Sequence, residues 1–201
     1  MRYGMVIDLK RCIGCETCTV ACKAANQIPL GILWNRVFKC ERGTYPNSRM
    51  VFFPINCMHC EDPECVKVCP TGASYKSGDG LVLVDSVKCM GCKYCILACP
   101  YGARSSFQEL EPFYGTRKTP LDELAEAKHL LGAVQKCDFC QDRVEKGLEP
   151  ACVASCVGRA KHFGDLDDPK SVVSLLVNQR NGFQLNPELG TNPSLFYLPD
   201  H

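Results

Sequence analysis

Cysteine is the residue type whose number and spacing suggest chemistry in this sequence. The 201 residues contain 17 cysteines, and all but Cys40 fall into four groups of four. In chain order these groups are Cys12, Cys15, Cys18, Cys22; Cys57, Cys60, Cys65, Cys69; Cys89, Cys92, Cys95, Cys99; and Cys137, Cys140, Cys152, Cys156. Cys40 belongs to no group, and we expect it to be a small buried side chain. Closely spaced sets of four thiolates are suited to holding metal.

The spacing within the groups distinguishes between iron–sulfur clusters, zinc and disulfides. Groups one and three have the pattern C-x2-C-x2-C-x3-C, the bacterial ferredoxin run whose fourth cysteine binds the other cluster of a pair. Zinc prefers two CxxC knuckles that are well separated in sequence and close one tetrahedron. Disulfide scaffolds are usually far shorter, and the cysteine count here is odd. We therefore predict four [4Fe–4S] clusters, with zinc as the alternative.

An internal repeat indicates how the groups combine. Asp8 and Cys12 align with Asp85 and Cys89, and groups two and four resemble each other. Groups two and three are close in sequence, so groups one and four must pair across them. With the fourth cysteine exchanged within each pair, we predict four ligand sets. They are site 1 (Cys12, Cys15, Cys18, Cys156), site 2 (Cys137, Cys140, Cys152, Cys22), site 3 (Cys89, Cys92, Cys95, Cys69) and site 4 (Cys57, Cys60, Cys65, Cys99).

The elements that position these cysteines predict an α+β fold. We expect two ferredoxin-like modules, one inserted in the other, with small antiparallel sheets and short helices. Module one would comprise residues 1–49 and 108–165, with an insertion at 109–134; module two would comprise residues 50–107; and residues 166–201 would form a C-terminal helix and a partner-binding arm.

Local patterns place several elements within this plan. We predict a strand at residues 5–8, a hairpin with strands at 75–76 and 81–84, and helices at 19–25, 138–146 and 169–180. A further helix would begin after an N-cap at Thr119 and run to about residue 131. Residues 182–201 have no clear period, and we expect them to lie either on their own domain or on a partner.

The remaining residues of possible functional interest surround the cysteines. Gly14 and Gly91 hold matching places in their loops, where tight turns would aim backbone N–H groups at sulfur. Four cations could offset cluster charge, with solvated surface charge as the alternative: Arg11, Lys88, Lys93 and Arg104. His59 is either a turn residue or a group that tunes a cluster.

Composition and motifs exclude several functions. The net charge of +1 gives no argument for nucleic acid or an anionic membrane surface. No window of 18 apolar residues and no signal peptide or twin-Arg pair is visible, so we expect no direct membrane insertion. No Ser–His–Asp set, nucleotide loop or open metal site appears, and we therefore predict no catalysis on this chain.

Several stretches of the sequence match a known family. They include Cys57-Met58-His59-Cys60, Cys69-Pro70-Thr71-Gly72-Ala73, Cys99-Pro100-Tyr101-Gly102 and Phe163-Gly164-Asp165-Leu166. With the four groups in this order, the chain resembles the iron–sulfur (B) subunit of the molybdenum or tungsten bis-pterin oxidoreductases of the dimethyl sulfoxide reductase type. It is most similar to polysulfide and thiosulfate reductase B subunits.

The resemblance implies a role in anaerobic respiration. The chain would carry four [4Fe–4S] clusters and relay electrons between a quinone-reactive membrane subunit and a bis-pterin catalytic subunit acting on polysulfide, thiosulfate, tetrathionate or arsenate. The implied order is site 1 next to the catalytic subunit, then sites 2, 3 and 4, with site 4 facing the membrane partner. The complex would lie on the periplasmic or outer face by co-export with its catalytic subunit, with a cytoplasmic location as the alternative.

Two other functions remain open at this point. The electron carrier could serve a cytoplasmic formate dehydrogenase, a hydrogenase-linked complex or an aromatic hydroxyl-transfer enzyme. A different class would be an iron–sulfur sensor or a zinc-binding interaction protein. A sensor usually needs a DNA-binding module, and neither a helix-turn-helix nor a basic patch is evident in the sequence.

Overall fold

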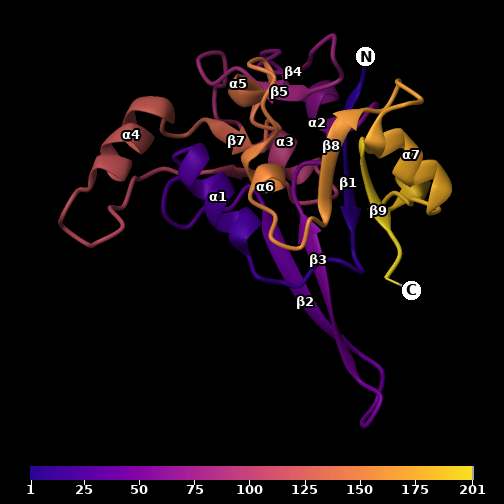
Figure 1. The fold of residues 1–201 in the computed structure, drawn as a ribbon. Coiled ribbons are helices and arrows are strands. Elements are labelled where there is room, and N and C mark those ends of the chain that lie inside the picture. Colours follow the sequence, from indigo (N-terminus) through magenta and orange to yellow (C-terminus); the bar gives the residue numbers. More distant parts are fainter. Residues whose placement is uncertain (201) are drawn as a thin grey trace.

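The computed structural model describes residues 1–200 as an assembly of short strands and short helices (Figure 1). The strands are β1 (Tyr3–Asp8), β2 (Arg36–Arg42), β3 (Arg49–Ile55), β4 (Ser74–Lys76), β5 (Val82–Val84), β6 (Arg104–Ser106), β7 (Val134–Lys136), β8 (Lys161–Asp165) and β9 (Leu195–Leu198). The helices are α1 (Thr17–Ala25), α2 (Glu64–Lys67), α3 (Tyr94–Leu97), α4 (Pro120–Lys128), α5 (Gln141–Val144), α6 (Ala151–Ala154) and α7 (Val172–Gln179). The predicted α+β class is confirmed.

A three-stranded sheet of order β8-β1-β9 joins the two ends of the chain. β1 pairs antiparallel with β8, from Tyr3↔Asp165 to Ile7↔Lys161, and parallel with β9, beginning at Met5↔Leu195. The central strand is buried because α7 packs against this sheet. The C-terminal segment therefore lies on its own domain, and its strand β9 was not predicted from the sequence.

The sequence repeat is visible as two helix pairs. Helices α1 and α6 pack on each other, and so do α3 and α2. Each pair combines one helix that follows a CxxC loop with one short helix that begins just after a proline, Pro150 in α6 and Pro63 in α2. Each pair therefore brings cysteines from two different groups close together.

Two small antiparallel pairs complete the arrangement. β4 and β5 form the predicted hairpin. β6 pairs with β7, a strand outside residues 50–107. Buried side chains from the inner and outer segments, including Met5, Leu81, Phe107 and Phe139, belong to one hydrophobic core. The two halves are thus held together by a strand pair and a common core.

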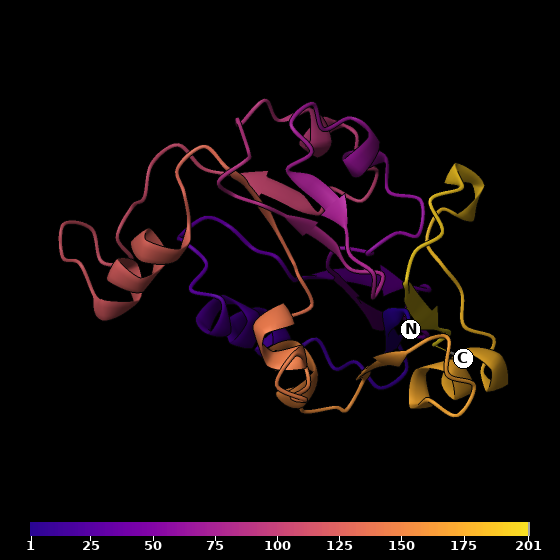
Figure 2. The ribbon, with the colours of Figure 1, turned by 90° about the horizontal axis from the view of Figure 1, so that it is seen from above.

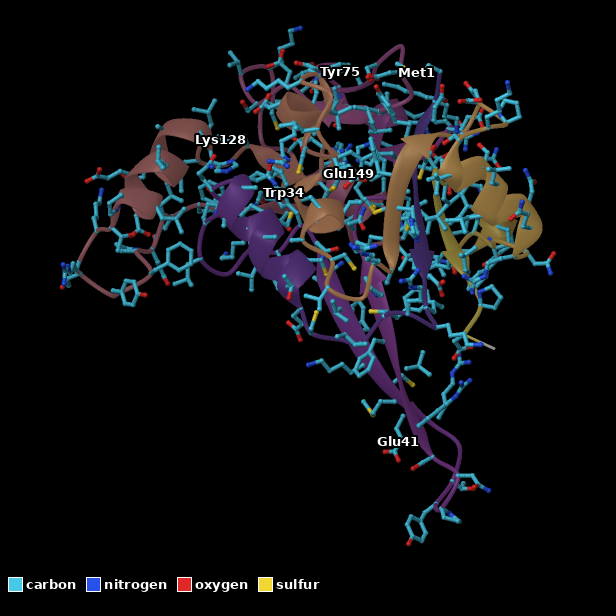
Figure 3. The ribbon with its side chains drawn as sticks, in the orientation of Figure 1. Met1, Trp34, Glu41, Tyr75, Lys128 and Glu149 are labelled. Atoms are coloured by element: carbon cyan, nitrogen blue, oxygen red, sulfur yellow. The ribbon has the colours of Figure 1, made fainter. Side chains whose placement is uncertain are left out.

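The β2–β3 hairpin projects from the body of the molecule (Figure 1). Its base packs against the core, but residues 42–50 are exposed, and Glu41 lies where the hairpin has left the body (Figure 3). Cys40 is exposed on this hairpin. The expectation that Cys40 is buried is wrong, because no second layer covers this part of the two strands.

The inserted segment carries α4, which lies on the opposite side of the molecule from α7 (Figure 2). The predicted N-cap is confirmed, since the Thr119 hydroxyl accepts from the Asp122 backbone N–H and the Asp122 carboxylate accepts from Thr119 in return. The predicted helix at 138–146 is mostly wrong: Phe139 and Cys140 adopt left-handed backbone angles, and only α5 forms after them. Among residues 1–200 we find no helix with the length and apolarity needed to span a membrane.

Four candidate iron–sulfur sites

Site 1 is a cavity lined by the four predicted cysteines Cys12, Cys15, Cys18 and Cys156. Three of them come from the loop after β1 and the start of α1, and Cys156 follows α6. Gly14 has a φ of +67°, and a Cβ there would lie 2.2 Å from a ring carbon of Phe52. The loop therefore packs so tightly on β3 that only glycine fits.

Site 3 is a second cavity, lined by the predicted Cys69, Cys89, Cys92 and Cys95. Its floor includes Val134, whose backbone N–H donates to Cys89 Sγ over 3.4 Å. The loop of group three and the cysteine that ends group two therefore meet, as the exchange of fourth cysteines requires.

Site 2 brings together Cys22, Cys137, Cys140 and Cys152, all of them buried. Burial raises the pKa of Cys22, and the neighbouring thiolates of Cys152 and Cys140 raise it further. The side-chain amide of Asn26 lies 3.8 Å from Cys22 Sγ and 3.6 Å from Cys140 Sγ. Cys22 thus lies with the thiols of group four rather than with those of its own group.

Site 4 combines Cys57, Cys60 and Cys65 with Cys99. Burial, followed by the charges of Cys57, Cys65 and Cys99, raises the pKa of Cys60 to about 12. A thiol with such a pKa is neutral near pH 7, whereas a thiol that coordinates a metal is deprotonated. Four free thiolates this close together would repel one another, and binding to iron cations would remove that repulsion.

The four CxxC loops share one feature of backbone conformation. The residue before the second cysteine has a positive φ in each: 67° at Gly14, 44° at His59, 74° at Gly91 and 56° at Phe139. The sequence pointed only to the two glycines. Their position directly before the second cysteine of a CxxC loop was the sequence signal that could also have identified His59 and Phe139.

Polar hydrogens aimed at sulfur show that the donor set fits an anionic cluster. The backbone N–H groups of Ser74 and Ala160 donate to Cys69 Sγ over 3.3 Å and to Cys156 Sγ over 3.2 Å. Side-chain donors reach Cys18 from Asn35 over 3.2 Å and Cys65 from Arg104 over 3.0 Å. Such bonds stabilise thiolates and tune cluster potentials.

The described residues contain no group of three His, Cys, Asp or Glu side chains arranged to hold a single metal ion. A cubane differs from such a site, because each of its cysteine ligands binds a different iron atom.

Contacts between the sites define an order. Helices α1 and α6, which carry Cys18 and Cys152, pack on each other, and this contact joins sites 1 and 2. Sites 4 and 2 are joined where His59, in the loop of site 4, bonds to the Cys137 carbonyl of site 2. Sites 4 and 3 are joined through Arg104, which donates to Cys65 Sγ and to Ser74 Oγ, since the Ser74 backbone N–H donates to Cys69 Sγ. These contacts favour the order 1, 2, 4, 3, which differs in its last two places from the order that the resemblance implied.

Three buried cations lie among the sites. Arg104 was predicted as a residue that offsets cluster charge, and it is buried. The other three predicted cations, Arg11, Lys88 and Lys93, are exposed. Lys136 and Lys161 are buried and were missed, because nothing in their sequence context separates them from surface lysines.

His59 is fully buried between the loops of groups two and four. Its Nδ1 accepts from the Val82 backbone N–H over 3.1 Å, so Nε2 carries the hydrogen that it shares with the Cys137 carbonyl over 3.0 Å. Burial, together with Lys136 and Arg104, holds its pKa well below the ordinary value. His59 is therefore a neutral side chain that is held in place by two hydrogen bonds and links the loops of groups two and four.

This fold and these cysteine sites define a protein built from [4Fe–4S] dicluster units. A family model described as "4Fe-4S dicluster domain" matches residues 48–113 and 116–166, and a second model with the same description matches residues 11–73.

Curated relatives identify the family within this class. The chain is 46% identical to the selenate reductase B subunit of Mesobacillus selenatarsenatis, over 98% of this chain and 72% of that protein. It is 40% identical to the iron–sulfur protein ArrB of the arsenate respiratory reductase of Shewanella sp. strain ANA-3, over 98% of this chain and 96% of the relative. Identity to the tetrathionate reductase B subunit of Salmonella typhimurium is 41%, over 98% and 72%.

The chain belongs to the iron–sulfur B subunits of the dimethyl sulfoxide reductase family of molybdoenzymes. It is a four-cluster electron-transfer subunit of a respiratory reductase complex and not the catalytic subunit. A [4Fe–4S] cluster takes up and releases single electrons at a potential set by its surroundings.

Proposed function

We propose that sites 1, 2, 4 and 3, in this order, hold the four clusters and relay electrons between a quinone-reactive membrane subunit and a bis-pterin catalytic subunit. One observation carries the proposal. Sites 1 and 3 each have one exposed cysteine, Cys15 and Cys92, whereas sites 2 and 4 have none. The two ends of the series are thus the ends that a redox partner can approach. The division of the chain into residues 1–49 with 108–165 and residues 50–107 belongs to the same proposal.

Exposed apolar side chains lie close in sequence to cysteines of both end sites. Val20 and Val157, which is 67% exposed, lie near site 1. Tyr94 and Leu97, which is 83% exposed, lie on α3 near site 3. Because exposed apolar clusters commonly mark protein contacts, both ends of the series have the character of docking faces.

The family relationship supports a direction for the series. Site 1 faces the catalytic subunit, and site 3, at the other end, faces the membrane subunit. The three relatives described above are named as components of selenate, arsenate and tetrathionate reductases, whereas another, at 44% identity, is named as a sulfite dehydrogenase subunit. We follow the reductases and propose electron flow from site 3 to site 1, with an oxyanion or sulfur compound as the final acceptor. The complex lies on the outer face of the membrane, exported together with its catalytic subunit.

The test replaces one apolar residue at each end in the native complex. Leu97→Asp should abolish reduction of the clusters by a quinol and leave their oxidation by the acceptor intact. Val157→Asp should do the reverse. Val172→Asp on α7, where the side chain is also exposed, is the matched control and should change neither. The proposal is wrong if both end variants lose the same half-reaction or if neither loses one.

A further inference from the structure

Three cations are buried in this protein without a carboxylate partner. Arg104, Lys136 and Lys161 are each only 4% exposed. None of them forms an ion pair with Asp or Glu within residues 1–200. An unpaired buried charge is strongly destabilising, so each cation requires an anion close by. Cysteines of the four sites lie close to all three cations.

Lys161 lies at the junction of sites 1 and 2. It lines the site 1 cavity, and its Nζ donates to Asn35 Oδ1 over 2.6 Å, while the Asn35 amide donates to Cys18 Sγ. Strand β8, which begins at Lys161, packs against α6, which carries Cys152 of site 2. One ammonium group therefore acts on both sites.

Arg104 lies at the junction of sites 4 and 3. Its guanidinium donates to Cys65 Sγ over 3.0 Å and to Ser74 Oγ over 2.8 Å. Ser74 in turn donates its backbone N–H to Cys69 Sγ of site 3. Burial lowers the pKa of Arg104, but thiolates from both sites, led by Cys65, raise it more.

Lys136 lies at the remaining junction, between sites 2 and 4. Its Nζ donates to the backbone carbonyl of Cys137 over 2.6 Å. The same carbonyl bonds to Nε2 of His59 in the loop of site 4, and Lys136 lies opposite Arg104 in the β6–β7 pair. Each of the three junctions in the series therefore contains one buried cation.

A fixed charge at a junction has a definite effect on electron transfer. Reduction adds one negative charge to a site, and a nearby cation in a poorly solvated interior stabilises the reduced form. Because each cation lies between two sites, it raises the potentials of both. A surface cation has far less influence, since water and salt screen it.

We infer that Lys161, Lys136 and Arg104 are the charges that set the potentials of this electron carrier, one for each pair of neighbouring sites. The inference rests on the ligand sets of the proposed function. Each residue acts on the clusters through its position and is itself neither reduced nor oxidised.

The test is an EPR-monitored redox titration of the native complex carrying Lys161→Met, Lys136→Met or Arg104→Met. Lys161→Met should lower two of the four midpoint potentials, each by at least a tenfold change in the reduction equilibrium, which is about 59 mV for one electron. Arg104→Met should lower the other two. Lys136→Met should lower one from each pair. This pattern can be recognised without assigning any signal to a site beforehand.

Matched variants separate charge from structure. Lys161→Arg keeps the charge, so it should change each of the four reduction equilibria by less than about threefold. Lys39→Met removes a cation that pairs with Glu16 next to Cys15 but is 50% exposed, and it should also leave them unchanged. The Met variants could lose iron because they also remove a hydrogen bond. Lys161→Gln keeps a donor for Asn35 and Arg104→Gln keeps one for Ser74, so in that case the Gln variants should show the shifts expected of the Met variants.

The inference is overturned if Lys161→Met and Arg104→Met shift the same clusters, if all four midpoints move equally, or if none moves. Iron and sulfide analysis judges the ligand sets separately. About 16 iron atoms in this chain with unchanged midpoints would reject the cation inference alone. Clearly fewer iron atoms in the wild-type complex would reject the ligand sets themselves.

Discussion

The rings of His59 and Phe139 stack with their centroids 3.8 Å apart and their planes 21° from parallel. The two residues occupy the same place in the CxxC loops of groups two and four. His59 is also hydrogen-bonded to the Cys137 carbonyl. This stack therefore holds the loops of sites 4 and 2 together, at the place where the proposed series of sites passes from residues 50–107 to the rest of the chain.

Truncating the stack should destabilise the protein strongly. Phe139 is 1% exposed, and Phe139→Ala should lower the free energy of unfolding by about 3–5 kcal/mol because it leaves a cavity. Urea unfolding of the holoprotein measures this. Phe38→Ala, at a site that is 51% exposed, is the matched control and should cost less than about 1 kcal/mol. Equal losses of unfolding free energy in the two variants would show that the stack contributes no more to stability than an exposed ring does.

The exchange of fourth cysteines gives a prediction that contradicts sequence proximity. Cys22→Ser should perturb the same EPR signal as Cys152→Ser, because both belong to site 2. Cys18→Ser should perturb a different signal, shared with Cys156→Ser. Cys40→Ser, on the projecting hairpin, should leave all signals and the iron content unchanged. If Cys22→Ser and Cys18→Ser affect one signal, the exchange is wrong.

Two glycines with the same backbone angle should respond differently to alanine. Gly72 has a φ of +66° and open space around it, so Gly72→Ala should cost only the backbone strain, about 1–2 kcal/mol. Gly14→Ala adds a clash with Phe52 to a φ of +67°, so the loss should be about 1–3 kcal/mol larger. Thermal unfolding of the two variants provides the comparison, and similar losses would mean that Phe52 yields without cost.

Stability should depend on pH through His129. Burial lowers its pKa, and its Nε2 bonds to the Asn26 carbonyl over 2.9 Å. As the pH falls below about 6.5, the unfolded chain binds a proton at this histidine before the folded chain does, so the free energy of unfolding falls. The stability advantage of the wild type over His129→Gln should therefore shrink between pH 7.5 and pH 5.5 in melting curves. His162 is present in both proteins, so its own lowered pKa cancels. A constant or growing difference contradicts the prediction.

The cysteines made the fold class predictable, because their spacing reflects the loop geometry that a cubane requires. The repeat of Asp8 and Cys12 at Asp85 and Cys89 also indicated which groups pair. The structure then places Cys156 with Cys12 and Cys22 with Cys140. Local spacing was informative here because each loop is formed by residues adjacent in sequence.

The features that were missed depend on distant contacts. β9 is only four residues long and is stabilised by pairing with β1 at the other end of the chain. The buried position of Lys161 results from its strand register opposite Ile7, and no periodicity reveals it. The order of the sites depends on how His59 meets Phe139, which only the packed structure specifies.

The pairing of β1 with β9 determines when each part of the molecule can be completed. Residues 50–107 contain the β4–β5 hairpin and all eight cysteines of sites 3 and 4, and β7, which pairs with β6, follows at Val134–Lys136. All of these residues leave the ribosome long before Leu195 is synthesised. The sheet next to sites 1 and 2 can close only after the last strand emerges, since chains are made from the N-terminus. The end proposed to meet the catalytic subunit is thus the last to mature. A catalytic partner that recognises the finished site 1 face would therefore bind only chains in which β9 has already paired with β1.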